Sequence, residues 1–212
     1  MKVIAAYLHT EKVHYVFHES ILAVAAYPKT WDFGTLPIGS GPLISKARNY
    51  ACEVFLKDTD ADYMLWCDSD MVFTGKDVQT LLDAMDGGRR PIVGAVYYGW
   101  NSGIRRMHST AMKLDDKGIY WSLMEDEIPE KGCKRVDAVG MGLTLIHRKV
   151  LEALKPDSER LWPFAEIIYN DRSIGEDITF CMRARQKGFR TWLCGDARAG
   201  HAKTLILPGI TE

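Results

Sequence analysis

Cysteine is scarce in this chain, and the cysteines that are present form no recognisable motif. They are odd in number and widely spaced, with no CxxC pair among Cys52, Cys67, Cys133, Cys181 and Cys194. A disulfide framework or a zinc ribbon needs paired or closely spaced cysteines, so the sequence indicates neither. We therefore expect the protein to work in a reducing compartment, the cytoplasm.

Long hydrophobic runs are also missing. The longest uncharged apolar stretch covers residues 21–27, far short of the roughly 20 residues that span a bilayer. Residues 1–8 are too few for the hydrophobic region of a signal peptide with its cleavage site, and they are typical of a first β-strand. The sequence therefore predicts a soluble protein without a transmembrane segment.

Neither sign of charge is in excess. The 212 residues include 27 Lys and Arg against 28 Asp and Glu, a net charge of −1, which gives no general attraction to nucleic acid or to an anionic membrane. Internal repeats, low-complexity tracts and linkers are absent as well. We expect residues 1–212 to form one α/β domain, a length that allows a substantial core.

What the first half does contain is an alternation of strand and helix patterns. Strands are expected at 3–8, in the apolar run from 63 and at 91–97, and helices at 13–24, from 45 and from 74. Ser45 and Thr74 are the expected N-caps, and Gly87-Gly88 ends the third helix. The Gly- and Pro-rich residues 29–43 are expected to be a connection. This order predicts a mainly parallel sheet with helices on both faces.

The second half differs, because its apolar segments are shorter and turns separate them. Strands are expected at 107–114 and 119–124 around a turn at 115–118, within the apolar run 136–146, and at 190–194; helices are expected at 148–154 and 177–187. Gly188 ends the last helix. We interpret this half as a smaller, antiparallel region attached to the mainly parallel sheet.

The strongest local signal is a pair of carboxylates one residue apart. Asp68 and Asp70 follow a buried apolar run, so they lie where a strand leaves the sheet, the edge at which open α/β sheets bind ligands. In an extended chain both carboxylates face one side while Ser69 points away. Two hard oxygens suit Mg²⁺ or Mn²⁺. A solvated turn that closes a strand is the alternative for an isolated DxD.

Other short features gain meaning from their order along the chain. Arg48 and Asn49 are expected in the first turn of a helix, where an arginine can bind phosphate, although for this feature alone a solvated basic turn is the more ordinary interpretation. Gly140 and Gly142 interrupt a buried strand, either for a ligand or for tight packing. Glu176 and Asp177 open a helix whose dipole would keep Asp177 ionised. His201 could complete a metal site and Lys203 could reach a phosphate.

Taken in order, these features resemble the nucleotide-sugar-dependent glycosyltransferases of GT-A fold, a Rossmann-like fold. The residues that carry the resemblance are Arg48-Asn49, Asp68-Ser69-Asp70, Gly140-Met141-Gly142, Glu176-Asp177 and His201. It covers nearly the whole chain. More narrowly, the small size is similar to the glycosyltransferase domain that large algal viruses encode to build capsid glycans, which would place the protein in the host cytoplasm.

The resemblance implies a role for each matching residue on the donor side. Asp70 and His201 would be the metal ligands, with Asp68 contacting the metal or the ribose, and the imidazole favours Mn²⁺ over Mg²⁺. The donor, most often a UDP-sugar in this family, would be held by Thr10, Arg48, Asp68, Ser69 and Lys203. The first 100 residues or so would then bind the nucleotide sugar.

The acceptor side would come from the remaining residues, about 101–212. Asp177, with Glu176 beside it, would face the hydroxyl of a glycan or glycoprotein acceptor, near Gly140, Gly142 and Trp162. In an inverting enzyme Asp177 would be the base. In a retaining enzyme the leaving phosphate would take the proton, and Asp177 or Glu176 would stabilise positive charge on the sugar. The sequence is compatible with both.

Three alternatives remain open at this stage. Asp68-Ser69-Asp70-Met71-Val72 also fits a haloacid-dehalogenase-type phosphatase, with Asp68 as nucleophile and Asp70 as general acid, but the late acidic motif after Gly195-Asp196 lacks its second Asp. A nucleotidyltransferase would need a Gly-rich phosphate loop, and the first strand is followed only by His9-Thr10-Glu11-Lys12. A domain that binds a nucleotide sugar or glycan without turning it over is the third alternative.

Overall fold

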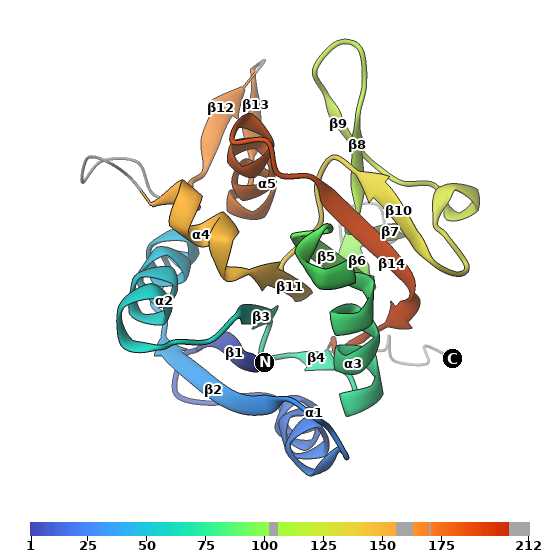
Figure 1. The fold of residues 1–212 in the computed structure, drawn as a ribbon. Coiled ribbons are helices and arrows are strands. Elements are labelled where there is room, and N and C mark those ends of the chain that lie inside the picture. The colour runs from blue at the N-terminus through green and yellow to red at the C-terminus, as the bar shows by residue number, and fades with distance from the viewer. Residues whose placement is uncertain (102–105, 156–162, 170, 204–212) are drawn as a thin grey trace, which may run out of the picture.

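A seven-stranded mixed sheet forms the centre of the molecule (Figure 1). The computed structural model describes residues 1–101, 106–155, 163–169 and 171–203. The strand order is β10-β14-β5-β11-β3-β1-β2. The bounds are β1 Lys2–His9, β2 Asp32–Gly39, β3 Tyr63–Cys67, β5 Ile92–Val96, β10 Cys133–Val136, β11 Leu143–His147 and β14 Thr191–Arg198. Three of the six pairings are parallel, and β10 and β11 account for the antiparallel ones.

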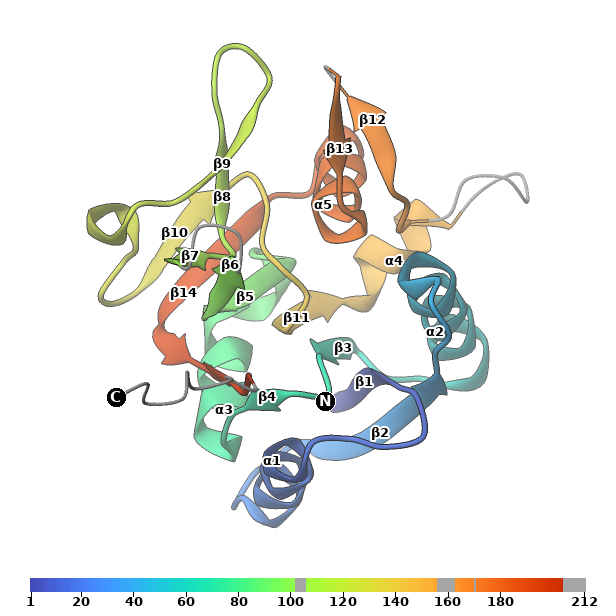
Figure 2. The same cartoon turned by 180° about the vertical axis from the view of Figure 1, so that it is seen from behind.

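Helices cover both faces of this sheet, as Figures 1 and 2 show. The helices are α1 Tyr15–Ala26, α2 Ile44–Asp58, α3 Gly75–Ala84, α4 Arg148–Leu154 and α5 Glu176–Gln186. Side chains of α2, α4 and α5 share one buried cluster, and those of α1 and α3 share the other. Strand β3 is buried on both faces because Met64 and Trp66 enter the first cluster, whereas Leu65 and Cys67 enter the second.

Short elements complete the structure around the sheet. Four two-stranded ribbons pair β4 Met71–Val72 with β15 Gly200–His201, β6 Tyr98–Asn101 with β7 Arg106–Ser109, β8 Met112–Leu114 with β9 Tyr120–Ser122, and β12 Ile167–Tyr169 with β13 Arg172–Ile174. Two 3₁₀ turns are η1 Asp86–Gly88 and η2 Glu125–Glu127. The expected α/β class and the turn at 115–118 are confirmed, whereas the predicted strand 107–114 is divided between β7 and β8.

The largest difference from the sequence prediction is β2. It lies within residues 29–43, which were expected to be a connection, and it pairs in parallel with β1 from Lys2 opposite Asp32 to His9 opposite Gly39. Proline and glycine argue against a central strand, but β2 is at the edge of the sheet, where both are tolerated. An edge strand therefore escaped a prediction based on apolar runs.

Helix termini confirm one predicted cap and correct another. Thr74 caps α3, and its side chain and that of Asp77 form a capping box. Ser45 is not a cap, because α2 begins at Ile44 after Leu43, which makes no side-chain capping bond. Arg48 consequently lies in the second turn of α2, and it is buried, which excludes a solvated basic turn.

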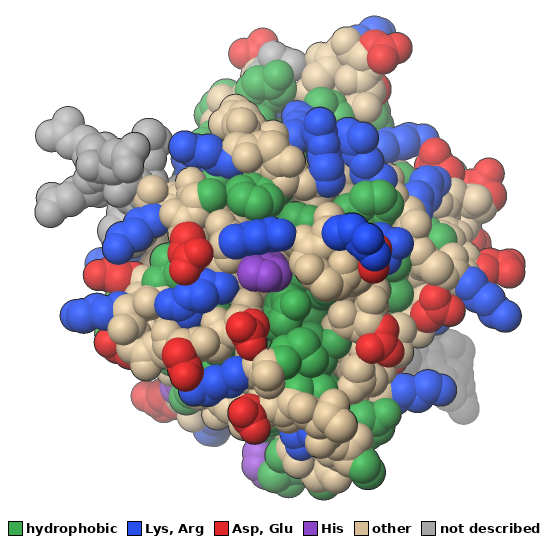
Figure 3. Space-filling model, in the orientation of Figure 1, with side chains coloured by type: hydrophobic (Ala, Val, Ile, Leu, Met, Phe, Trp, Pro, Cys, Tyr) green, Lys and Arg blue, Asp and Glu red, His purple; other side chains and the backbone are tan. Residues whose placement is uncertain are grey.

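The surface carries charged side chains of both signs. On the face shown in Figure 3, Lys and Arg side chains lie among Asp and Glu side chains over most of the surface. Within the part of the chain that the structure describes, no helix is both long enough and apolar enough to cross a membrane.

Candidate active site

The Asp-Ser-Asp segment is a turn at the carboxyl end of β3. The amide of Met71 donates to the carbonyl of Asp68 at 3.0 Å, and the amide of Asp68 donates to the carbonyl of Gly142 at 3.0 Å. The expected extended geometry, with both carboxylates on one side, is therefore wrong. Because the chain turns here, the two aspartates meet different partners. Ser69 is partly buried between them, and its carbonyl accepts from His14.

Asp70 meets a histidine and a lysine from the far end of the sequence. Its Oδ2 lies 3.2 Å from His201 Nε2 and 2.7 Å from Lys203 Nζ. The ribbon of β4 and β15 makes this contact possible, because Met71 is paired with His201, and the amide of Ala202 donates to the carbonyl of Asp70 at 2.8 Å. Backbone pairing thus holds Asp70 beside His201 and Lys203, which follow it by more than 130 positions in the sequence.

The electrostatics of this cluster keep Asp70 ionised. Burial raises the pKa of Asp70, but the hydrogen bonds from His201 and Lys203 outweigh burial and lower it to about 2. The pKa of His201 is raised, chiefly by its hydrogen bond to Asp70 and against the effect of burial. At neutral pH Asp70 therefore offers two anionic oxygens to a cation.

The donor set fits a divalent metal. His201 Nδ1 lies 3.0 Å from the carbonyl oxygen of Tyr98, and since a carbonyl only accepts, Nδ1 carries a proton. Nε2 donates a second proton to Asp70 when the ring is protonated, and it would give up that proton to bind a metal ion. A histidine oriented in this way is typical of metal sites, and an imidazole beside a carboxylate suits Mn²⁺. Among the described residues no three His, Cys, Asp or Glu side chains form a group that could hold a metal ion by themselves, so substrate oxygens and water would complete the coordination.

Arg48 is a buried link between the two acidic segments. Its Nη2 lies 3.0 Å from Asp68 Oδ1 and its Nε lies 3.3 Å from Glu176 Oε1. The guanidinium lies over the rings of Trp66 and Phe164, 5.0 Å and 5.8 Å from their centroids. Burial lowers the pKa of Arg48, but the neighbouring carboxylates raise it above its usual value. With its side chain only 6% exposed, Arg48 holds Asp68 and Glu176 in place, and its role in binding the nucleotide stays a prediction.

The next residue on α2 fixes the segment before β12. Asn49 Nδ2 donates to the carbonyl of Phe164 at 2.8 Å, and its Oδ1 accepts from the amide of Phe164 at 2.9 Å. This two-point contact holds the Phe164 ring over the Arg48 guanidinium. The pair Arg48-Asn49 was selected from the sequence, but its burial and its partners could not be predicted.

Glu176 and Asp177 lie at the start of α5, with different surroundings. Glu176 is paired with Arg48, whereas Asp177 Oδ1 accepts only from the amide of Ile178, at 2.8 Å, among the contacts described. Burial, followed by the charge of Glu176, raises the pKa of Asp177 to about 6. Asp177 is thus still mostly ionised at pH 7, as expected, but its pKa lies above the ordinary value because of burial and Glu176. A carboxylate with a pKa near the working pH is well suited to accept a proton.

The remaining predicted residues are only partly connected to this cluster. Thr10 is exposed just after β1. Gly140 and Gly142 have a packing reason, because an added Cβ would lie 2.2 Å and 2.6 Å from atoms of the Tyr97 side chain. Their acceptor role stays a prediction. Trp162 lies outside the described residues.

Two residues of the site were missed by the sequence reasoning. Tyr97 supports the glycine segment, since the amide of Gly142 donates to its hydroxyl at 2.8 Å. Tyr98 orients His201 through a backbone carbonyl. A backbone contact leaves no signal in residue type, and Tyr97 looked like an ordinary core residue at the end of a strand.

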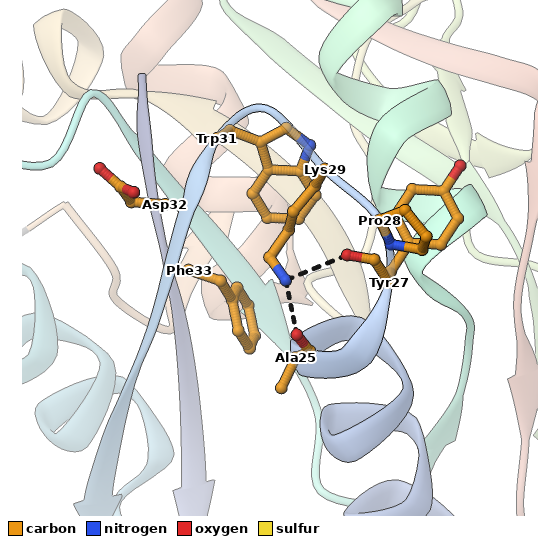
Figure 4. A pocket seen from close by; sticks show the side chains of 7 residues that line it. All are labelled: Ala25, Tyr27, Pro28, Lys29, Trp31, Asp32 and Phe33. Carbon is orange, nitrogen blue, oxygen red and sulfur yellow. Dashed lines mark hydrogen bonds between the residues drawn. The ribbon is translucent and has the colours of Figure 1, made fainter.

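A separate pocket of about 460 Å³ lies away from these residues, beside the first residues of β2 (Figure 4). Since β2 and β3 both run parallel to β1, the start of β2 lies at the amino ends of these strands and the end of β3 at their carboxyl ends. Lys29 Nζ donates to the carbonyls of Val24, Ala25 and Tyr27. The amine therefore completes the end of α1, and the pocket contains no part of the acidic cluster.

Comparison with known proteins matches a part of the chain that includes residues of the acidic site. The model of the family described as glycosyl transferase family 2 matches residues 43–154, which include Arg48 and both aspartates of the turn. A search of curated protein sequences found no match.

Solved structures share the fold. A197 from STIV is 18% identical, with a TM-score of 0.60, over 100% of this chain and 99% of that one. GalNAc-T7 with UDP, GalNAc and Mn²⁺ is 11% identical, with a TM-score of 0.64, over 94% of this chain and 43% of that one. This chain thus spans less than half of GalNAc-T7. The α/β fold of GT-A type expected from the sequence is confirmed.

Proposed function

Because this chain belongs to glycosyl transferase family 2, we propose that it is a metal-dependent hexosyltransferase that uses a UDP-sugar and glycosylates a glycan or glycoprotein. The observation that carries the proposal is the cluster of Asp70, His201 and Lys203 at the carboxyl end of β3. The UDP and Mn²⁺ in the GalNAc-T7 structure support the choice of donor and metal. The cytoplasmic location and the resemblance to an algal-virus domain stay predictions.

The donor side would stabilise the leaving group. When the bond from sugar C1 to the diphosphate oxygen breaks, negative charge develops on the diphosphate. A divalent cation held by Asp70 and His201 would supply positive charge there. Lys203, whose side chain is 44% exposed, would turn its ammonium group from Asp70 toward a phosphate oxygen. Both His201 and Lys203 come from the second half of the chain, so donor binding draws on both halves.

The acceptor side would remove a proton. Asp177 is the better base of the acidic pair, because Glu176 is neutralised by Arg48 and Asp177 is not. The proton of the acceptor hydroxyl would pass to an oxygen of Asp177 as the hydroxyl oxygen bonds to C1, which is the inverting route. Arg48 would position Asp68 and Glu176 on either side of the reacting atoms. A phosphatase with Asp68 as nucleophile fits less well, because Arg48 holds this carboxylate.

Ligand-dependent thermal stability tests the proposal, because a ligand that binds only the folded protein raises its Tm. We expect UDP to raise the Tm in the presence of Mn²⁺ by about 5–10 °C at 100 times its Kd, and the shift to disappear with chelator. GDP and ADP are the comparison nucleotides.

Two variants sharpen this measurement. Asp70→Ala should abolish the shift, whereas Asp116→Ala, which removes an exposed carboxylate from the β8–β9 turn, should retain it. An unchanged shift in Asp70→Ala would refute the metal assignment. No response to any nucleotide with either Mn²⁺ or Mg²⁺ would leave a phosphatase or a glycan-binding domain as the better interpretation.

A further inference from the structure

Two cysteines that are 61 positions apart in sequence lie opposite each other in the sheet. Cys133 of β10 is paired with Cys194 of β14 in an antiparallel register. The amide of Gly195 donates to the carbonyl of Gly132 at 2.8 Å. Because this bond joins the neighbouring residues, Cys133 and Cys194 form a non-hydrogen-bonded pair. In such a pair the Cα atoms are about 4.5 Å apart and the side chains are at their closest. Disulfides form over Cα separations of about 4.4–6.8 Å.

Both thiols lie on the same face of the sheet, but their accessibility differs. Cys194 is buried, and Cys133 is partly exposed and packs against the same apolar cluster. Strand β10 is at the edge of the sheet, next to β14 alone, so a small molecule can approach Cys133 from outside. Burial, followed by the neighbouring Cys133, raises the pKa of Cys194 to about 11.

The other cysteines provide a contrast within the same chain. Cys52, Cys67 and Cys181 are at most 3% exposed and lie on three different elements, α2, β3 and α5. Burial raises the pKa of each of these thiols. They pack as small apolar side chains, whereas the pair of Cys194 and the partly exposed Cys133 is suited to thiol chemistry.

We propose that Cys133 and Cys194 form a dithiol site that closes reversibly to a disulfide by exchange with a small disulfide such as oxidised glutathione. The thiolate of Cys133 attacks one glutathione sulfur, the glutathione S–S bond breaks, and one glutathione leaves and takes up a proton. Cys194 then gives its proton to the solvent and attacks Cys133 Sγ, which releases the second glutathione. The protein loses two electrons and two protons, and two glutathione thiols are formed.

Closing this bond would tie the edge strand to the sheet. The covalent link would join β10 directly to β14, the strand that leads through Ala199 to β15 and His201. It would also close a loop of about 60 residues in the unfolded chain, which stabilises the folded state. We expect the oxidised protein to unfold at a Tm about 5–10 °C above that of the reduced protein. This inference does not depend on the proposed sugar transfer.

The test uses the folded full-length chain in glutathione buffers of increasing oxidising strength, quenched with acid, denatured and alkylated. We expect the number of alkylated thiols to fall from five to three, with peptide mass spectrometry locating one intramolecular bond between Cys133 and Cys194. Reduction with dithiothreitol should restore all five thiols and the lower Tm.

Two variants serve as a matched comparison. Cys133→Ser should keep its four thiols free and show no rise in Tm, whereas Cys52→Ala should still lose two thiols and still gain stability. Five free thiols in the oxidised wild-type protein would overturn the proposal. So would a glutathione adduct that persists on Cys133, because it would show that Cys194 cannot reach it.

Discussion

The two acidic segments of the site place their carboxylates in opposite electrostatic surroundings. Asp70, in the turn after β3, accepts hydrogen bonds from His201 and Lys203, and its pKa is lowered to about 2. Asp177, at the start of α5, is partly buried beside another acid, and its pKa is raised to about 6. The first carboxylate is suited to hold a cation at any physiological pH, and the second is suited to exchange a proton. Residue type alone would have given both the same role.

The largest expected effect is on catalysis and concerns Asp177, the proposed base. Asp177→Asn removes the proton acceptor while keeping size and shape, so we expect kcat to fall about 10²–10⁴-fold with the UDP and Mn²⁺ shift in Tm unchanged. Steady-state kinetics and the thermal shift together check this. Glu176→Gln should reduce kcat less, because Glu176 is already neutralised by Arg48. Full activity in Asp177→Asn would exclude Asp177 as the base.

The next effect concerns the residue that links both segments. Arg48→Met should lower the free energy of unfolding by about 3–5 kcal/mol, because Asp68 and Glu176 would lose their buried partner. Denaturant unfolding measures this loss. Arg48→Lys restores the charge but not the two-sided contact, so it should recover part of the stability and little of kcat. If Arg48→Met were as stable as the wild type, the salt bridges would have no structural role.

The features predicted from sequence share a local physical origin. The strand before Asp68 follows from a continuous apolar run, and the start of α3 follows from a capping box within four residues. In contrast, β2 is an edge strand that needs no apolar run. The burial of Arg48 depends on Phe164 and Glu176, which lie more than 110 positions away. Contacts of this kind are set by the packing of the whole sheet, so no local pattern encodes them.

A smaller effect on kcat is expected for Lys203, on the donor side of the site. Lys203 is partly exposed, so Lys203→Met should lower kcat by about 10²-fold, the low end for loss of one group that stabilises a leaving anion. Lys203→Arg keeps the charge and should recover most of the rate. Lys76→Met, on the exposed side of α3, is the control and should have no effect. Equal rates for the wild type and Lys203→Met would remove Lys203 from the mechanism.

The smallest effect is the contribution of Asp177 to the pH dependence of stability. Because its pKa in the folded protein is about 6, against 3.8 as the ordinary value, the folded state binds the proton more tightly than the unfolded state. The free energy of unfolding should therefore fall as pH rises from about 4 to 6, by about 2 kcal/mol once partial exposure is allowed for. Asp70, with its lowered pKa, acts in the opposite direction and below pH 4.

The difference between the wild type and Asp177→Asn isolates this contribution. Urea unfolding of both proteins between pH 4 and pH 7 should show Asp177→Asn gaining relative stability as pH rises, with a plateau above about pH 6. Asn cannot ionise, so it avoids the cost of a buried charge beside Glu176. If the Asp177→Asn variant lost catalysis but gained stability, the carboxylate at the start of α5 would be retained for chemistry and not for stability. Parallel pH curves for the two proteins would mean that Asp177 titrates as an ordinary surface carboxylate, and the contrast with Asp70 would be lost.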